Sequence, residues 1–88
     1  MHEPATPDAV PITVYWRPGC PFCSELLWHL DRSGLVFENV NIWADPDAAA
    51  FVRSVASGNE VVPTVTVGVT SLVNPSMKEI LALHNAAA

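Results

Sequence analysis

Two cysteines separated by two residues are the part of this chain best suited to covalent chemistry. Cys20 and Cys23 flank Pro21-Phe22 and are the only cysteines in the chain. An apolar run, residues 12–16, precedes them, and leucines at helical spacing follow, which predicts a strand that leads into a helix. A thiol at a helix N-terminus faces unpaired N–H groups and the positive end of the helix dipole, which stabilise its thiolate. The motif therefore predicts thiol–disulfide redox chemistry.

The two thiols have different expected roles. Pro21 suits the first helical position because it has no N–H to leave unpaired. Cys20 is then expected at the helix cap, facing outward, with Cys23 one turn further along the same side. We expect Cys20 to attack an external disulfide and Cys23 to resolve the mixed disulfide that forms. Arg17, a short distance before Cys20 in the sequence, is expected to add a cation that favours the thiolate.

A structural disulfide and a zinc site are the alternatives for such a cysteine pair. A bridge that closes so short a loop constrains the unfolded chain little. Zinc takes about four ligands, and the candidates besides the cysteines are His2, His29 and His84, at no recognised spacing. The strand before the pair and the helix after it favour redox chemistry over both alternatives, and no metal ligand is expected.

Composition narrows the classes of partner. The chain of 88 residues has a net charge of −5, and its four basic residues form no cluster, which argues against nucleic acid as a partner. No apolar run approaches the length of a membrane span, and the N-terminus lacks the basic and apolar regions of a signal peptide. We therefore expect a cytoplasmic monomer with no membrane partner. Cysteine pairs in that compartment are more often catalytic than structural.

The remaining sequence predicts one domain, residues 11–88, after a flexible arm, residues 1–10. Asp45-Pro46 and Asn74-Pro75 each place a capping residue before a proline, which predicts two helix starts. The predicted strands are 11–16, 35–42, 63–67 and 71–73, and the predicted helices are 21–33, 47–57 and 76–86. This β-α-β-α-β-β-α order predicts an α/β fold with a mixed four-stranded sheet and helices on both faces.

The cysteine motif and a later Val62-Pro63-Thr64 together resemble the glutaredoxin branch of the thioredoxin superfamily. Residues 47–52, Gly58-Asn59 and Asn74-Pro75-Ser76 resemble the mycoredoxins, the glutaredoxin-like proteins of bacteria that use mycothiol. The resemblance implies a thioredoxin fold and a cis peptide bond at Val62-Pro63. It also implies reduction of protein–mycothiol mixed disulfides, with mycothiol as reducing co-substrate, mycothiolated or disulfide-bonded proteins as partners, and no tightly bound cofactor.

The same resemblance implies a cleft for the thiol adduct, formed by the cysteine loop, the residue before the cis proline and the start of the last helix. In this sequence these positions are Phe22, Val62, Pro63 and Ser76. Asn74-Pro75 stands where glutaredoxins usually carry Gly-Gly, which disfavours glutathione as the ligand. The loop 67–70 is also shorter than in most mycoredoxins, so the rim of the cleft is expected to differ.

Chemistry supports a neutral ligand at these positions. Asn74, Ser76 and the Val62 backbone can hydrogen-bond a neutral sugar and amide, and Arg17 completes the expected substrate-binding set. Two other functions stay open: a thioredoxin-like electron carrier reduced directly by a flavin-dependent reductase, and a module that binds an iron–sulfur cluster. Phe22 argues against the first, because such carriers often have a polar residue there. Cys23 argues against the second, because cluster-binding relatives usually lack it.

Overall fold

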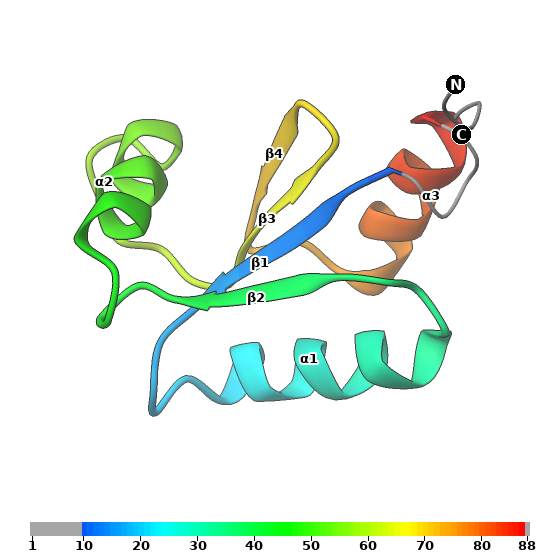
Figure 1. Ribbon diagram of the computed structural model, residues 1–88, viewed down its shortest axis with the longest axis horizontal. Helices are drawn as coiled ribbons and strands as arrows, with labels where there is room; N and C mark the ends of the chain where they lie inside the picture. The colour runs from blue at the N-terminus through cyan, green and yellow to red at the C-terminus, as the bar shows by residue number, and fades with distance from the viewer. Residues whose placement is uncertain (1–9, 88) are drawn as a thin grey trace, which may run out of the picture.

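Strand β1 (Ile12–Trp16) lies inside a four-stranded sheet whose strand order is β2-β1-β3-β4 (Figure 1). It pairs in parallel with β2 (Glu38–Asn41) and antiparallel with β3 (Thr64–Val67), which in turn pairs antiparallel with β4 (Thr70–Val73). This computed structural model describes residues 10–87. The predicted α/β fold with a mixed four-stranded sheet is confirmed.

Three helices cover the sheet: α1 (Pro21–Ser33), α2 (Pro46–Val55) and α3 (Met77–Ala87). Figure 1 shows α1 and α2 on opposite sides of the two strands β1 and β2. Residues of α1 and α3 share one buried cluster, so these two helices cover the same face. None of the helices within residues 10–87 has the length and apolar character that a membrane crossing requires.

Alternation along the strands divides the interior into two unequal parts, because successive side chains point to opposite faces. The larger cluster lies under α1 and α3, and its buried members are Ile12, Val14, Leu26, Leu30, Val65, Val67 and Ile80. The smaller cluster lies under α2 and consists of Ile42, Ala48, Ala49 and Val52. Two of its four members are alanines, so this cluster buries less apolar side-chain volume than the larger one.

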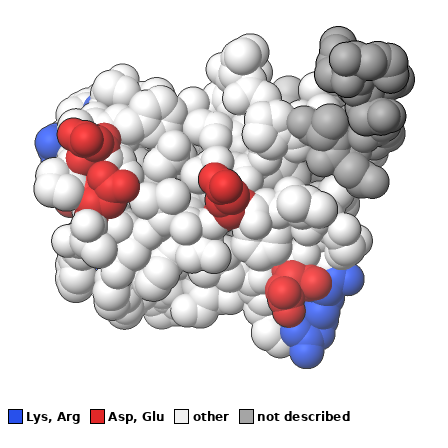
Figure 2. All heavy atoms as spheres, in the orientation of Figure 1, with Lys and Arg blue, Asp and Glu red and all other residues white. Residues whose placement is uncertain are grey.

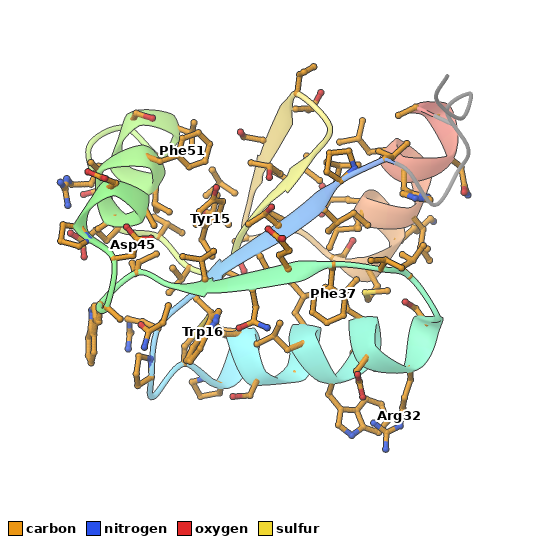
Figure 3. The ribbon with its side chains drawn as sticks, in the orientation of Figure 1. Tyr15, Trp16, Arg32, Phe37, Asp45 and Phe51 are labelled. Atoms are coloured by element: carbon orange, nitrogen blue, oxygen red, sulfur yellow. A yellow bond between two sulfur atoms is a disulfide. The ribbon has the colours of Figure 1, made fainter. Side chains whose placement is uncertain are left out.

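Aromatic side chains fill the rest of the α2 face. The rings of Tyr15 and Phe51 lie 5.1 Å apart between centroids and point toward one another in Figure 3. Burial raises the pKa of Tyr15, and the carboxylates of Asp45 and Glu38 add to the rise because they disfavour a second negative charge. Phe37 lies on the other side, between β2 and α1, where it packs against the larger cluster.

Element boundaries differ from the sequence predictions by a few residues. The second strand is predicted over 35–42, but only Glu38–Asn41 pairs, because β1 is five residues long and its register starts at Thr13. The second helix is predicted over 47–57 and ends at Val55, because Ser57 and Gly58 both adopt positive φ. The expected arm falls outside the described residues except for Val10, which packs against the larger cluster.

Candidate active site

Cys20 forms the N-cap of α1. Its backbone is extended, with φ −109° and ψ 101°, and Pro21 follows at the first turn, as the sequence predicts. The Cys23 N–H donates to Cys20 Sγ at 3.2 Å, and the two side chains form a disulfide with Cα atoms 5.2 Å apart. The sulfur therefore accepts one of the N–H groups that a helix start leaves without an intrahelical partner.

The exposure of Cys20 corrects one expectation. The sequence predicts an outward-facing Cys20, but its exposed fraction is only 7%, against 1% for Cys23. The reason is that Sγ turns toward the start of α1 and bonds to Cys23 rather than pointing into solvent. The relative exposure of the two cysteines still agrees with the prediction, because Cys20 is more accessible than Cys23.

The loop before β3 lies against this sulfur. The Val62-Pro63 peptide bond is cis, as the resemblance implies, and the Val62 carbonyl oxygen lies 3.8 Å from Cys20 Sγ. The Val62 side chain packs on the opposite side, against the cluster under α2, so its backbone faces the thiol. The Pro63 carbonyl accepts the Asn74 N–H at 2.8 Å, which ties the loop before β3 to the segment that leads into α3.

The start of α3 corrects a second expectation. Asn74-Pro75 is predicted as the cap, but Asn74 has φ 51° and the capping role falls to Ser76. The Glu79 N–H donates to Ser76 Oγ at 3.2 Å, and the Ser76 N–H donates to Glu79 Oε1 at 2.8 Å. This reciprocal pair is a capping box, and the Ser-x-x-Glu spacing that encodes it is visible in the sequence.

A cavity of about 320 Å³ lies between the starts of α1 and α3. Four predicted substrate-binding residues line it: Phe22, Pro63, Asn74 and Ser76. Sequence reasoning missed the other lining residues, which are Glu25, Leu26, His29, Pro75 and Met77. The spacing of positions 22, 25, 26 and 29 places them along one side of a helix that begins at the cysteine motif, which is a signal that was available in the sequence.

Arg17 and Val62 are the predicted binding residues that do not line this cavity. The Arg17 guanidinium lies over the Trp43 ring, 5.5 Å from its centroid, and donates to the Pro18 carbonyl at 3.0 Å. Trp43 itself is 63% exposed. The effect of Arg17 on the Cys20 thiolate therefore stays a prediction, while Val62 contributes its carbonyl to the edge of the site.

Charge is sparse around the site. No Lys or Arg is among the described residues that line the cavity, whereas Glu25 is. On the face drawn in Figure 2, basic side chains appear at opposite ends of the molecule and form no patch. Within residues 10–87 no group of three or more His, Cys, Asp and Glu side chains is placed to hold a metal ion. The arrangement is suited to exchange of sulfurs beside a partly apolar groove whose described lining includes a carboxylate but no Lys or Arg.

Comparison with known proteins agrees with this geometry. The family model described as Glutaredoxin matches residues 12–71. Mycoredoxin 1 of Corynebacterium glutamicum is 36% identical over 72 residues, a stretch that covers 81% of this chain and 89% of that protein.

Solved structures give the same picture of the fold. The glutaredoxin-like NrdH-redoxin of Escherichia coli, described as having a thioredoxin-like activity profile, superposes with a TM-score of 0.71 and 31% identity over 84% of this chain and 95% of that one. Glutaredoxin C1 of poplar superposes with a TM-score of 0.68 over 93% of this chain and 90% of that one, at 21% identity. The predicted thioredoxin fold is confirmed.

Proposed function

Because the chain belongs to the glutaredoxin family and is a thiol–disulfide oxidoreductase, we propose that it reduces mixed disulfides between proteins and mycothiol. The observation that carries the choice of thiol is the cleft beside the cysteine pair, whose described lining contains no Lys or Arg. Mycothiol joins an acetyl-cysteine to a glucosamine–inositol pair, which is rich in hydroxyls and has no carboxylate. The likeness to Mycoredoxin 1 supports the same choice.

The first step is attack by the Cys20 thiolate on the mycothiol sulfur of the adduct. A Cys20–mycothiol disulfide forms, the old disulfide breaks, and the substrate protein leaves as its thiol after taking up a proton. The Cys23 N–H that points at Cys20 Sγ stabilises the attacking thiolate. Cys20 is nucleophilic in this scheme because it is the more accessible thiol and caps the helix.

Two routes then clear mycothiol from Cys20: the first returns the reduced enzyme, and the second leaves a disulfide that two further mycothiol molecules must reduce. A second mycothiol attacks the mycothiol sulfur held on Cys20, which gives mycothiol disulfide and frees the Cys20 thiolate. Alternatively, the Cys23 thiolate attacks Cys20 Sγ, expels mycothiol and leaves the Cys20–Cys23 disulfide. The first route does not use Cys23, so Cys20 alone suffices when the small thiol is abundant.

Binding of the adduct uses the walls of the cleft. The exposed ring of Phe22 contacts the apolar part of the ligand, and the buried Pro63 lies at the base of the cleft. The Val62 backbone pairs with its amide as an added strand would, and the Asn74 amide and Ser76 hydroxyl hydrogen-bond its sugar. Arg17, over Trp43, contacts the protein part of the substrate instead.

The remaining assignments follow from this reaction. The protein needs no tightly bound cofactor, its reductant is mycothiol, and its partners are mycothiolated or disulfide-bonded proteins rather than nucleic acid or membrane. Residues 11–88 act as one domain, and the protein works as a monomer in the cytoplasm, where mycothiol is reduced.

The test compares two adducts of the same labelled protein, one with mycothiol and one with glutathione, each supplied with its matching thiol as reductant. We expect the mycothiol adduct to be cleared about ten-fold faster or more, since one unfavourable polar contact is worth about that factor. Equal or faster clearance of the glutathione adduct would overturn the mycothiol assignment and leave an ordinary glutaredoxin.

A second candidate function is supported by the likeness to NrdH-redoxin. In that case a flavin-dependent reductase with its nicotinamide cofactor, rather than mycothiol, would reduce the Cys20–Cys23 disulfide. Supplying each reductant alone separates the two functions. Turnover with the flavoenzyme and none with mycothiol would favour the electron carrier, and the opposite result supports the proposal above.

A further inference from the structure

Glu79 of α3 is exposed and does not itself line the cleft, but it is hydrogen-bonded to Ser76, which does. Its Oε1 accepts the Ser76 N–H at 2.8 Å, and Ser76 lines the cavity. Backbone N–H groups at a helix start are the groups that bind an incoming anion. Here one of them is already bonded to a carboxylate that belongs to the protein, so an anionic ligand has to compete with Glu79 for it.

A second carboxylate faces the same cleft from the other side. Glu25 of α1 lines the cavity, and His29, one turn further along α1, is the other titratable residue in the described lining. Lys78 adjoins Glu79 in the sequence and, like it, is exposed and outside the described lining, but only Glu79 is hydrogen-bonded to the lining residue Ser76. A ligand carboxylate therefore meets repulsion from Glu25 in the α1 wall and from Glu79, which lies behind Ser76 on the α3 side.

An uncharged polar ligand meets no such penalty. Hydroxyl groups can donate to the carboxylate of Glu25 and can accept from the Asn74 amide and the Ser76 hydroxyl. We infer that Glu79, seated on the Ser76 N–H, is a specificity-determining residue that makes the cleft prefer uncharged thiol adducts to adducts that carry a carboxylate. The inference rests on the proposed function only in assuming that this cleft receives the small-thiol half of the disulfide.

The experiment uses two mixed disulfides of one labelled peptide, with 2-mercaptoethanol and with 3-mercaptopropionate. The two small thiols have similar length, but one ends in a hydroxyl and the other in a carboxylate. In a single turnover, Cys20 attacks the small-thiol sulfur and releases the peptide thiol, and Cys23 then expels the small thiol and leaves the Cys20–Cys23 disulfide. No mycothiol is needed, so the second-order rate constants measure charge preference alone.

We expect the wild-type protein to react roughly three- to ten-fold faster with the uncharged adduct at low salt, with a smaller ratio as salt screens the carboxylates. Glu79→Gln should lower the ratio toward that of the free peptide disulfides with a small model thiol, and the preference that remains is due to Glu25. Gln also serves at this position of a capping box, so the helix start is retained. Urea unfolding of each variant checks that the fold is intact.

Three further variants separate charge from structure. Glu79→Asp keeps the charge but shortens the reach to the Ser76 N–H, so it should retain most of the wild-type ratio even though the cap is weakened. Glu25→Gln removes the other carboxylate without touching the α3 cap and should narrow the ratio as well. Glu38→Gln, the matched control, removes an exposed carboxylate on β2 outside the cleft and should leave the ratio unchanged.

Two results would overturn the inference: a wild-type ratio of rate constants no larger than that of the model thiol, or an equal decrease of the ratio in Glu79→Gln and Glu79→Asp.

Failure of the proposed function would give a different pattern of results. If the charge ratio collapses while mycothiol adducts are still cleared preferentially, charge selection fails and the proposed function stands. If the ratio holds but mycothiol adducts react no faster than adducts of other uncharged thiols, the mycothiol assignment fails and charge selection stands.

Discussion

The starts of α1 and α3 face the same cleft but use the same helix-end chemistry in opposite ways. At α1 the cap is a sulfur, and the Cys23 N–H points at Cys20 Sγ. At α3 the cap is the Ser76 hydroxyl, and Glu79 closes it with a carboxylate. One helix end is left to stabilise charge that develops on a reacting atom, whereas the other is already neutralised by the protein. The difference lies in the capping group: at α1 the cap is itself the reacting sulfur, whereas at α3 the cap is a hydroxyl closed by a carboxylate that takes no part in the reaction.

The largest effect should come from removing the sulfur at the α1 cap. Cys20→Ser should lower clearance of a mixed disulfide by roughly 10³-fold or more, since the nucleophile is lost. Cys23→Ser should stay within a few-fold of wild type when the small thiol is in excess, because that thiol can clear Cys20. Steady-state release of the labelled protein measures both, and full activity of Cys20→Ser would reverse the roles assigned to the pair.

A smaller effect tests whether the α1 start activates only one thiol. In the reduced protein at pH 6, an alkylating reagent should modify Cys20 roughly ten-fold faster than Cys23, because only Cys20 sits at the cap and it is the more exposed of the two. Peptide mapping by mass spectrometry after short exposure gives the two rates. Faster modification of Cys23 than of Cys20 would contradict the conclusion that the start of α1 activates Cys20.

The smallest effect concerns stability. It compares the Ser76 cap of α3, which lies at the cleft, with the Asp45 cap of α2, which does not. Asp45 caps α2, where its Oδ1 accepts the Ala48 N–H at 3.1 Å, away from the cleft. Asp45→Ala and Ser76→Ala should each lower the free energy of unfolding by about 1 kcal/mol. Urea titration measures that loss. Only Ser76→Ala should also slow clearance of the mycothiol adduct, so equal clearance rates would show that Ser76 acts solely as a cap.

Much of the fold follows from local sequence. Three features each have a local cause that a sequence displays: the Cys20-Pro21 start of α1, the Asp45-Pro46 start of α2, and Gly34, which ends α1 with φ 82°. The two-residue turn between β3 and β4 also has a local cause, because it contains Gly68, which adopts φ 60°. These features depend on neighbouring residues alone, which is why the predicted order of elements is confirmed.

The features that escaped prediction depend on segments distant in the sequence or on competition between neighbours. Asn74 and Ser76 are both good caps, and the capping box with Glu79 decides between them. The low exposure of Cys20 accompanies its contact with Val62, 42 positions away. The sequence spacing places His29 on the same side of α1 as Phe22, but the packing of α3 beside that side of α1 does not follow from any local pattern.

The same separation of 42 positions between Cys20 and Val62 has a consequence for folding during translation. A ribosome releases β1, α1 and β2 first, and with them both thiols. The strand β3 that pairs with β1, and the two segments that form the other wall, follow only after α2 has been made. The nascent chain thus contains both cysteines before the cleft that selects among disulfide substrates is complete. The segments that complete the cleft are synthesised in the last third of translation.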